Sequence, residues 1–478
     1  NVAKSAPERC EACNGTALKQ EDDVLDTWFS SALWPFATLG WPENTADLGY
    51  FYPTQAMVTS SQIIFLWVAR MIMTGLYFMG DIPFPVVHIN PTVLNWEGRR
   101  MSKSLGTGVD PLEMTSQYGT DATRFGLIWQ TSGQEVKFTD ERLEAGRNFC
   151  NKIWNAARLV LRNSAESEIS AADLKETPKR AADQGGFAEK WILFRLNRAI
   201  NNTRDALDRD RFDEAARGLH EFFWSEFCDW YLELAKIEVG SAETLSQKRL
   251  VHQVMLYVLE RCLRLLHPFL PFITEEIWQY LPHEGEYIMA APYPEAQGLE
   301  EAGAETSMAR LVALVTATRR MRAERKVPQS EQVNVEITGA DSPLCDFVAE
   351  NEGLLRSLLR ARAVSIVDEP TLPGPPDRIA ASDQDAAHAL ADTPESAGSA
   401  DIYLSRQVDA KTVQAEIERL SKALQQAESE VERTASNLDN KQFLSRAPEH
   451  VVEKIRGRNR EAKKEAESLR EPIATLRE

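Results

Sequence analysis

The sequence predicts a multidomain protein in which an α/β portion is followed by all-α portions. The chain has 478 residues, 43% of them apolar, which is enough to bury several cores. Residues 24 to 145 alternate between short apolar runs and turn signals, a pattern typical of α/β structure. From about residue 140 to 290 strand signals give way to long amphipathic helices, and heptad spacing marks the C-terminal part.

Charge and cysteine content exclude several classes of protein. A formal net charge of −18 argues against a protein that coats nucleic acid indiscriminately, because nonspecific phosphate binding needs a basic surface. The longest apolar stretch, residues 63 to 73, carries Arg70 and is too short to cross a bilayer, so no membrane contact is expected. The 6 cysteines are too sparse for a disulfide framework and indicate the cytoplasm. Nothing at the N-terminus resembles a signal peptide. The chain starts at Asn1 without a methionine, which suggests a fragment or a processed product.

The polar segment at residues 1 to 23 contains a Cys-x-x-Cys pair. Cys10 and Cys13 have the spacing that supplies two of the four ligands of a tetrahedral zinc ion. The sequence has no second pair of this kind, so bound zinc would need ligands from another segment or a partner. Two reduced, inert thiols are the alternative interpretation.

Short strands and one apolar helix are expected in the α/β portion. Residues 57 to 60 and 86 to 90 have the character of strands, and residues 63 to 78 that of a buried helix. Asp110 and Pro111 should begin a further helix, because aspartate caps a first helical turn and proline presets its φ angle.

A basic, hydroxyl-bearing and glycine-ended loop occupies residues 99 to 108. Lys103 can act as a mobile positive charge, Ser102 and Ser104 can donate hydrogen bonds, and the glycines let backbone N–H groups approach an anion. These residue types suit the negative charge that develops on a polyphosphate as it is cleaved. A solvated basic turn is the simpler interpretation of the same composition.

Residues from about 140 to 290 are predicted to form a helical bundle. Amphipathic runs cover residues 191 to 208, 212 to 236 and 248 to 267. Aromatic residues are dense in these runs, and at helical spacing they are expected to form the core rather than a ligand platform.

A linking region and a hairpin complete the chain. An alternating strand at residues 333 to 337 precedes a stretch at 368 to 400, rich in Pro and Ala, that is expected to be loop. Heptad spacing at residues 417 to 438 and 452 to 476 predicts an antiparallel coiled-coil hairpin. Its second helix carries basic residues that either contact RNA phosphates or form a solvated face: Arg456, Arg458, Arg460, Lys463 and Lys464.

Several motifs, in order along the chain, resemble those of the valyl-tRNA synthetases. The segment Arg100-Met101-Ser102-Lys103-Ser104 is similar to the "KMSKS" loop of class I aminoacyl-tRNA synthetases, with arginine replacing the first lysine. The other matching motifs lie at residues 23 to 31, 67 to 71, 154 to 158, 227 to 233 and 267 to 278. The Asp-Thr-Trp-Phe-Ser-Ser motif and the terminal hairpin favour the valyl family over the isoleucyl family.

The resemblance implies an organisation for the whole chain. Residues 1 to 23 would be a remnant of the editing insertion, 24 to 145 the C-terminal part of a Rossmann catalytic domain, and 146 to 300 a helical anticodon-binding domain. Residues 301 to 408 would form a small α/β linking region, and 409 to 478 a coiled-coil arm that binds tRNA.

The resemblance also implies a reaction and the residues that perform it. In the family, valine attacks the α-phosphate of ATP in the presence of Mg²⁺, and the valyl-adenylate then acylates the 3′-terminal adenosine of tRNA(Val). Lys103 matches the catalytic lysine, and Arg100, Met101, Ser102 and Ser104 match the rest of the ATP-binding loop. Trp28 and Trp67 match tryptophans of the amino-acid pocket, with ordinary core positions as the alternative.

The sequence departs from the family pattern in several respects, which include residues 59 to 62 and 90 to 92, where adenosine or adenylate contacts are expected in the family. The His-x-Gly-His motif that faces the ATP phosphates in the family is absent, and so is the editing domain. The isolated chain is therefore expected to form no adenylate, and the complete protein to act as a monomer. Two alternatives stay open: a tRNA-binding module without catalysis, and a sister synthetase specific for isoleucine or leucine.

Overall fold

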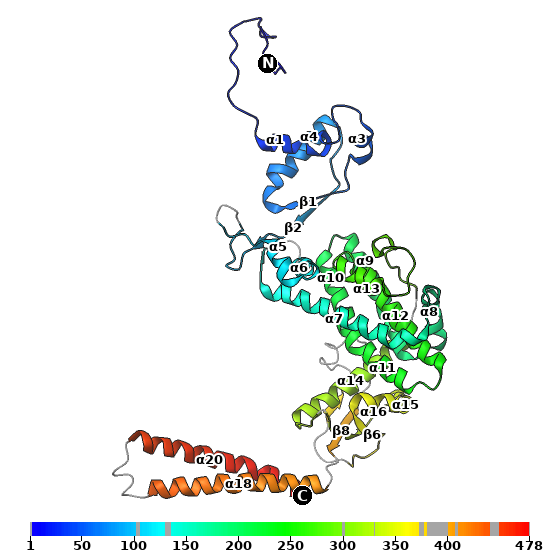
Figure 1. Cartoon of the computed structure of the whole chain (residues 1–478), viewed down its shortest axis with the longest axis vertical. Coiled ribbons are helices and arrows are strands. Elements are labelled where there is room, and N and C mark those ends of the chain that lie inside the picture. The colour runs from blue at the N-terminus through cyan, green and yellow to red at the C-terminus, as the bar shows by residue number, and fades with distance from the viewer. Residues whose placement is uncertain are drawn as a thin grey trace. The chain divides into compact units, whose positions relative to one another are not determined.

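The computed structural model describes residues 2–101, 106–129, 135–298, 302–328, 330–371, 377–379, 400–406, 410–439 and 449–477. The chain divides into two compact units, Asn1–Met308 and Ala309–Glu478. The first unit contains the α/β portion and a helical domain, and the second contains a small sheet and a helix hairpin (Figure 1). The predicted combination of α/β structure, helical domain and hairpin is confirmed.

The α/β portion is built on two short parallel sheets. Strand β1 (Ala56–Ser60) pairs in parallel with β2 (Val86–Asn90), and β3 (Val93–Leu94) pairs in parallel with β4 (Val136–Lys137). The two longer strands lie where the sequence predicted them. The helices of this portion are α1 (Thr27–Ala32), α2 (Trp34–Ala37), α3 (Ala46–Phe51), α5 (Pro111–Tyr118) and α6 (Thr120–Ile128).

The connection between β1 and β2 differs from the buried helix that the sequence predicted. It consists of the 3₁₀ turn η1 (Ser61–Ile63), the π-helical turn η2 (Ile64–Val68) and the helix α4 (Ala69–Phe78). Only one face is covered, by a cluster that includes Val68, Met71 and Phe84, whereas Phe65 is 85% and Tyr77 82% exposed. The prediction of full burial was wrong because two paired strands offer too little surface to cover an apolar helix on all sides.

The same connection bears on the expectation of no membrane contact. Within the described residues, Ser61–Phe78 is long and apolar enough to cross a membrane, with a mean hydropathy of 1.4 over 18 residues. This stretch is longer than the apolar run considered in the sequence. Core helices of soluble proteins share this length and composition. Its place between two parallel strands is that of a crossover connection.

The helical domain, residues 140 to 290, forms a continuous core. Its largest fully buried side chains include Trp191, Phe223, Phe227 and Tyr231, so the aromatic residues are core as predicted. Its elements are α7 (Asp140–Ser164), η3 (Ala165–Ser167), α8 (Ala171–Gln184), α9 (Phe187–Asp208), α10 (Phe212–Glu221), η4 (Phe222–Tyr231), α11 (Leu232–Ser241), α12 (Leu245–Leu266), α13 (Pro271–Trp278) and η5 (Ile288–Ala290).

Charged groups are paired inside this helical core. The guanidinium of Arg195 on α9 donates two hydrogen bonds, of 2.7 and 2.6 Å, to the carboxylate of Glu226 on η4. Glu305 lies 3.3 Å from Arg195 and 3.4 Å from Arg198. A buried charge is tolerated only when it is paired in this way, so the network fixes how α9 and η4 pack together.

The second unit begins within α14 (Ala302–Glu324) and contains a four-stranded sheet. The central strand β5 (Val333–Thr338) pairs in parallel with β6 (Ala361–Ile366) and antiparallel with β8 (Ala400–Arg406), which also pairs with β7 (Asp377–Ile379). Helices α15 (Ser342–Glu350) and α16 (Glu352–Leu359) connect β5 to β6. The strand predicted at residues 333 to 337 is confirmed. Within the predicted loop at 368 to 400, β7 adds an edge strand, and residues 372–376 and 380–399 lie outside the described residues.

Two long helices, α18 (Ala410–Asp439) and α20 (Glu449–Arg477), pack along each other as the predicted hairpin (Figure 1). The predicted heptad positions form the contact, since Ala427, Ala462 and Ala466 are buried. A polar pair interrupts this apolar seam: the amide of Asn459 donates to the hydroxyl of Thr434 at 2.8 Å. The predicted turn at residues 440 to 448 lies outside the described residues.

Candidate functional site

The predicted phosphate loop begins at a tight turn that follows strand β3. The side chain of Asn95 accepts hydrogen bonds from the backbone N–H groups of Glu97 and Arg99, at 3.1 and 2.8 Å. Arg100 then returns to form an antiparallel bridge with Leu94. The loop therefore leaves from the carboxyl end of a strand in a parallel sheet, which is where α/β folds bind their ligands.

The two ends of the loop are joined to each other. The hydroxyl of Thr107 donates to the backbone carbonyl of Arg100 at 3.2 Å, and Gly106 has a φ of +63°, which favours glycine. Asp110 caps α5 as predicted, accepting a hydrogen bond of 2.8 Å from the N–H of Leu112. Arg100 is exposed, and Ser102, Lys103 and Ser104 lie outside the described residues.

The flanks of the loop are anchored in an apolar cluster. Met101 and Val109, on either side of the loop, pack against buried residues of α5, α6 and α7. The buried members of this cluster are Met114, Tyr118, Ala122, Phe138 and Leu143. The predicted ATP contact of Met101 is therefore accompanied by a packing role, and the position of the loop depends on how α5 and α6 are held.

The predicted amino-acid pocket residues lie on neighbouring elements. Trp28 is on α1 and Trp67 is on η2, both are half-buried, and these two elements contact each other. The indole N–H of Trp67 donates to the carbonyl of Ser31 at 3.0 Å, which ties η2 to α1. At the carboxyl end of β1 the hydroxyl of Thr59 is buried and has no hydrogen-bond partner among the described residues. A polar group of this kind at the end of a parallel strand is suited to a ligand.

Cys10 and Cys13 lie in a short turn that backbone hydrogen bonds close. The N–H of Cys10 donates to Gly15 at 2.9 Å, and the N–H of Asn14 donates back to Cys10 at 2.8 Å. Backbone N–H groups of Cys13 and Ala12 and the Cys13 side chain lower the pKa of Cys10 below the ordinary thiol value. Among the described residues no group of three or more His, Cys, Asp or Glu side chains could hold a metal ion, and the zinc half-site stays a prediction.

The five basic residues predicted to contact tRNA are all exposed on α20. Arg456 and Arg460 each pair with Glu453, at 3.5 and 3.1 Å, and exposed ion pairs of this kind are weak. Positions 456, 460, 463 and 464 share one face of the helix, because residues three and four apart lie above one another. Arg458 lies on another face.

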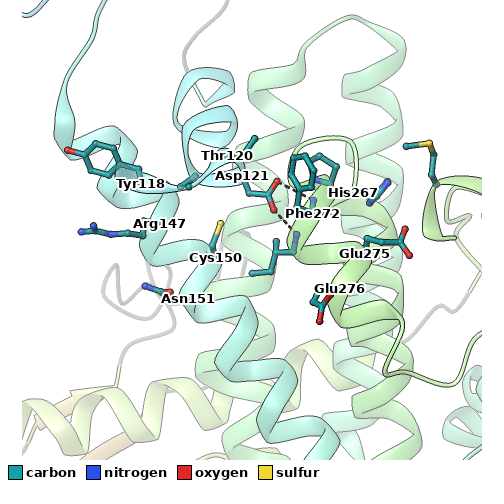
Figure 2. A pocket seen from close by; sticks show the side chains of 15 residues that line it. Tyr118, Thr120, Asp121, Arg147, Cys150, Asn151, His267, Phe272, Glu275 and Glu276 are labelled. Carbon is teal, nitrogen blue, oxygen red and sulfur yellow. Dashed lines mark hydrogen bonds between the residues drawn. The ribbon is translucent and has the colours of Figure 1, made fainter. Parts of the chain in front are cut away.

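A contact that the sequence did not predict joins the loop segment to the helical domain. The carboxylate of Asp121 on α6 accepts hydrogen bonds from the N–H groups of Ile273 and Phe272 on α13, at 2.7 and 3.3 Å (Figure 2). Burial raises the pKa of Asp121 above the ordinary aspartate value, whereas these two hydrogen bonds act in the opposite direction. No local sequence signal marks the contact, because its two sides are 151 and 152 residues apart.

Comparisons with known proteins identify the class to which this fold and loop belong. Residues 2–139 match the family model "tRNA synthetases class I (I, L, M and V)", and residues 189–337 match "Anticodon-binding domain of tRNA ligase". Residues 412–477 match "Valyl tRNA synthetase tRNA binding arm". The α/β portion, the helical domain and the hairpin are thus those of a class I aminoacyl-tRNA synthetase.

The relatives narrow this class to one family. The chain is 42% identical to the valine–tRNA ligase of Thermotoga maritima over 478 residues, which is 100% of the chain and 50% of that protein. It is also 42% identical to the valine–tRNA ligase of Carboxydothermus hydrogenoformans, over 98% of the chain and 50% of that protein. The chain belongs to the valyl-tRNA synthetase family and corresponds to the C-terminal half of its members. It spans about half the length of the curated relatives that it matches.

Solved structures of other synthetases resemble the chain more distantly. The ternary complex LeuRS-tRNA-LeuAMS of Agrobacterium radiobacter K84 is 20% identical and matches 69% of this chain and 38% of that one, with a TM-score of 0.46.

Proposed function

We propose that the chain provides the pyrophosphate-side loop and the tRNA-binding parts of a valine–tRNA ligase. The observation that carries this proposal is the match to two valine–tRNA ligases along nearly the entire chain, together with an arm of the valyl type. ATP, valine and tRNA(Val) are the proposed substrates, and the cytoplasm is the proposed compartment. The complete protein is proposed to act as a monomer.

The proposed chemistry at the loop is electrostatic. When the carboxylate of valine attacks the α-phosphate of ATP, the bond to the β-phosphate breaks and negative charge accumulates on the departing pyrophosphate. Lys103 is proposed to stabilise this charge, with Ser102 and Ser104 as hydrogen-bond donors and Arg100 as a second cation. The hydrogen bond from Thr107 to the carbonyl of Arg100 supports this role, because it holds the two flanks of the loop together. Mg²⁺ would neutralise part of the phosphate charge.

Two further groups of residues are assigned proposed roles. Trp28 and Trp67 would present flat apolar surfaces to the branched side chain of valine. Cys10 and Cys13 fit half of a tetrahedral zinc site, because the N–H groups around Cys10 favour its thiolate form. Zinc would need two more ligands from outside the described residues.

The tRNA-binding part of the proposal can be tested on the chain itself. Filter binding should show affinity for tRNA(Val) that falls as salt rises, since each phosphate contact releases counterions. Replacing Lys463 and Lys464 by alanine should lower the slope of log affinity against log salt by about two. Lys422→Ala on the other helix of the hairpin is the matched control. Equal affinity for all tRNAs, or no dependence on salt, would contradict the proposal.

The catalytic part requires the other half of the enzyme. The chain alone should give no valine-dependent pyrophosphate exchange, whereas the chain joined to the first half of the Thermotoga maritima relative should give it. Lys103→Ala in the joined protein should reduce exchange by about two to three orders of magnitude, the typical loss of one transition-state donor, while leaving tRNA binding unchanged.

A tRNA-binding module without catalysis is the second candidate. The exposed basic face of α20 and the match to a tRNA-binding arm favour it independently of the loop. A binding module would describe the chain better under two conditions: the chain binds tRNA(Val), and the joined protein folds but gives no valine-dependent pyrophosphate exchange.

A further inference from the structure

We infer that Asp121 and Arg124 form a clamp through which the helical domain holds the phosphate-loop segment in place, so that Asp121 is a positioning residue for the reaction at that loop. The role of the loop in this inference rests on the proposed function, whereas the clamp itself is described by geometry alone. Both side chains belong to α6, and both contact the corner between α12 and α13.

The clamp places a charge of the favourable sign at each of two helix ends. Asp121 is 7% exposed and accepts from the first N–H groups of α13, where the helix dipole is positive. The guanidinium of Arg124 donates to the carbonyls of Pro268 and Phe269, just after α12, at 3.1 and 3.4 Å. Negative partial charge collects at that end of a helix. Asp121 and Arg124, on one turn of α6, thus pair with the free N–H groups that begin α13 and with the carbonyl groups that follow α12.

A packed path leads from the clamp to the loop. Ala122, next to Asp121, belongs to the apolar cluster that also holds Met101 and Val109 at the two flanks of the loop. The backbones of α6 and α7 are in very close approach there, since a Cβ atom on Gly146 would lie 2.5 Å from the carbonyl oxygen of Ala122. Close-packed contacts transmit a displacement rather than absorbing it, so a shift of α6 against the corner should reach the loop flanks.

A cavity lies beside the clamp, so the hydrogen bonds of Asp121 and Arg124 largely fix the corner between α12 and α13. Asp121, His267 and Phe272 line a cavity of about 830 Å³ together with Arg147 and Cys150 of α7 (Figure 2). Because this side of the corner faces open volume, side-chain packing there cannot replace the lost contacts if Asp121 is removed. A buried carboxylate with two N–H donors is also directional, which suits a positioning role.

Hydrogen exchange on the full chain tests the clamp. In Asp121→Ala, amides at residues 268 to 278 should exchange about tenfold faster or more, because charge-assisted hydrogen bonds are lost, and amides at residues 106 to 118 should follow. Asp121→Asn should restore part of the protection at both places, because asparagine also caps helices. Arg124→Lys keeps the charge but not the planar guanidinium, so it should speed exchange at the same residues by a smaller factor. This variant replaces Asp121→Ala in the experiment if Asp121→Ala does not fold.

The matched control is another carboxylate cap in the chain. Asp341 accepts from the N–H of Leu344 at 2.9 Å at the start of α15, so Asp341→Ala removes a similar cap without touching α6. Its effect on exchange should stay within residues 341 to 350. Faster exchange in Asp121→Ala that is confined to residues 119 to 125 and 268 to 278, with residues 106 to 118 unchanged, would overturn the inference.

The same variant separates this inference from the proposed function. Asp121→Ala should retain salt-dependent binding of tRNA(Val), since the substitution leaves the proposed phosphate contacts of the arm in place. If the unmodified chain fails to bind tRNA, the proposed function fails and the exchange result still decides the clamp. In the joined protein, the variant should lower the rate of pyrophosphate exchange more than it raises the KM for ATP.

Discussion

The helical domain and the α/β portion bury their surfaces to very different extents. The helical domain encloses its aromatic residues and even the paired charges of Arg195 and Glu226. The α/β portion has two-stranded sheets and exposes Phe65 and Tyr77 on its longest helical connection. The helical domain thus covers its own apolar surface, whereas the α/β portion exposes apolar surface that a larger sheet and its covering helices would bury.

The largest effect is expected from breaking the buried ion pair of the helical domain. Arg195→Met should lower the free energy of unfolding by about 3–5 kcal/mol, because it leaves Glu226 buried without its partner. Urea denaturation followed by circular dichroism measures this. Arg198→Met, whose side chain is 35% exposed against 9% for Arg195, is the control and should cost far less. Equal costs would show that the domain does not depend on the buried pair.

A pair of phenylalanine substitutions tests the contrast in burial directly. Phe227→Ala in the helical core should destabilise that domain by about 3–5 kcal/mol, because it creates a cavity. Phe65→Ser in the α/β portion should change stability by less than about 0.5 kcal/mol, since the ring is exposed and loses few contacts. The same change should reduce the binding of a hydrophobic dye. A stability loss at Phe65 comparable to that at Phe227 would show that the exposed face is packed in solution.

The carboxyl group of Glu238 is expected to make the stability of the helical domain depend on pH. Burial and the neighbouring carboxylate of Glu189 raise the pKa of Glu238 to about 10, well above its ordinary value. A carboxyl group with a raised pKa in the folded state binds its proton more tightly there than in the unfolded state. The contribution of Glu238 to the free energy of unfolding is therefore fully present at low pH. This contribution is lost as pH rises from the ordinary glutamate pKa, about 4.3, toward about 10.

Glu238→Gln keeps the neutral shape and should therefore remove this loss. The variant should have a Tm a few degrees higher than the unmodified chain at about pH 8 and nearly the same Tm at about pH 4. Glu233→Gln, on the exposed face of the same helix, is the control. A variant that is equally or less stable at the higher pH would show that Glu238 is ionised in the folded protein.

The smallest effect is expected in the hairpin, where the seam contains a polar pair. Asn459→Leu should raise the stability of the hairpin by roughly 1 kcal/mol or leave it unchanged, while permitting more than one register between α18 and α20. Hydrogen exchange of the hairpin amides would detect multiple registers as mixed protection patterns. A single sharp pattern would show that apolar packing alone sets the register.

Periodicity and turn chemistry predicted much of the fold, because these signals are local. The strands at 57 to 60 and 86 to 90, the cap at Asp110 and the seam of the hairpin follow from spacing and residue type. The burial of α4 could not be predicted, since exposure depends on how many strands lie beside it. The clamp at Asp121 was missed for a related reason: its partners are backbone N–H groups on α13, and every residue has a backbone.

The candidate site was predictable to a more limited degree. The composition of residues 99 to 108 indicated a phosphate, and the bridge between Leu94 and Arg100 gives this loop a defined base. The roles of Lys103, of the two tryptophans and of the basic residues on α20 stay predictions. What composition cannot give is the anchoring of Met101 and Val109, because that depends on packing between segments far apart in the sequence.

The hydrogen bond between Asn459 and Thr434 has a geometric consequence for the hairpin. If one helix slid along the other by a single turn, the amide of Asn459 would face Val431 or Leu438 and lose its hydroxyl partner. The hydrogen bond therefore opposes sliding of α20 along α18, and it fixes how each helix is rotated about its own axis. The basic residues at positions 456, 460, 463 and 464 of α20 therefore keep one orientation relative to α18.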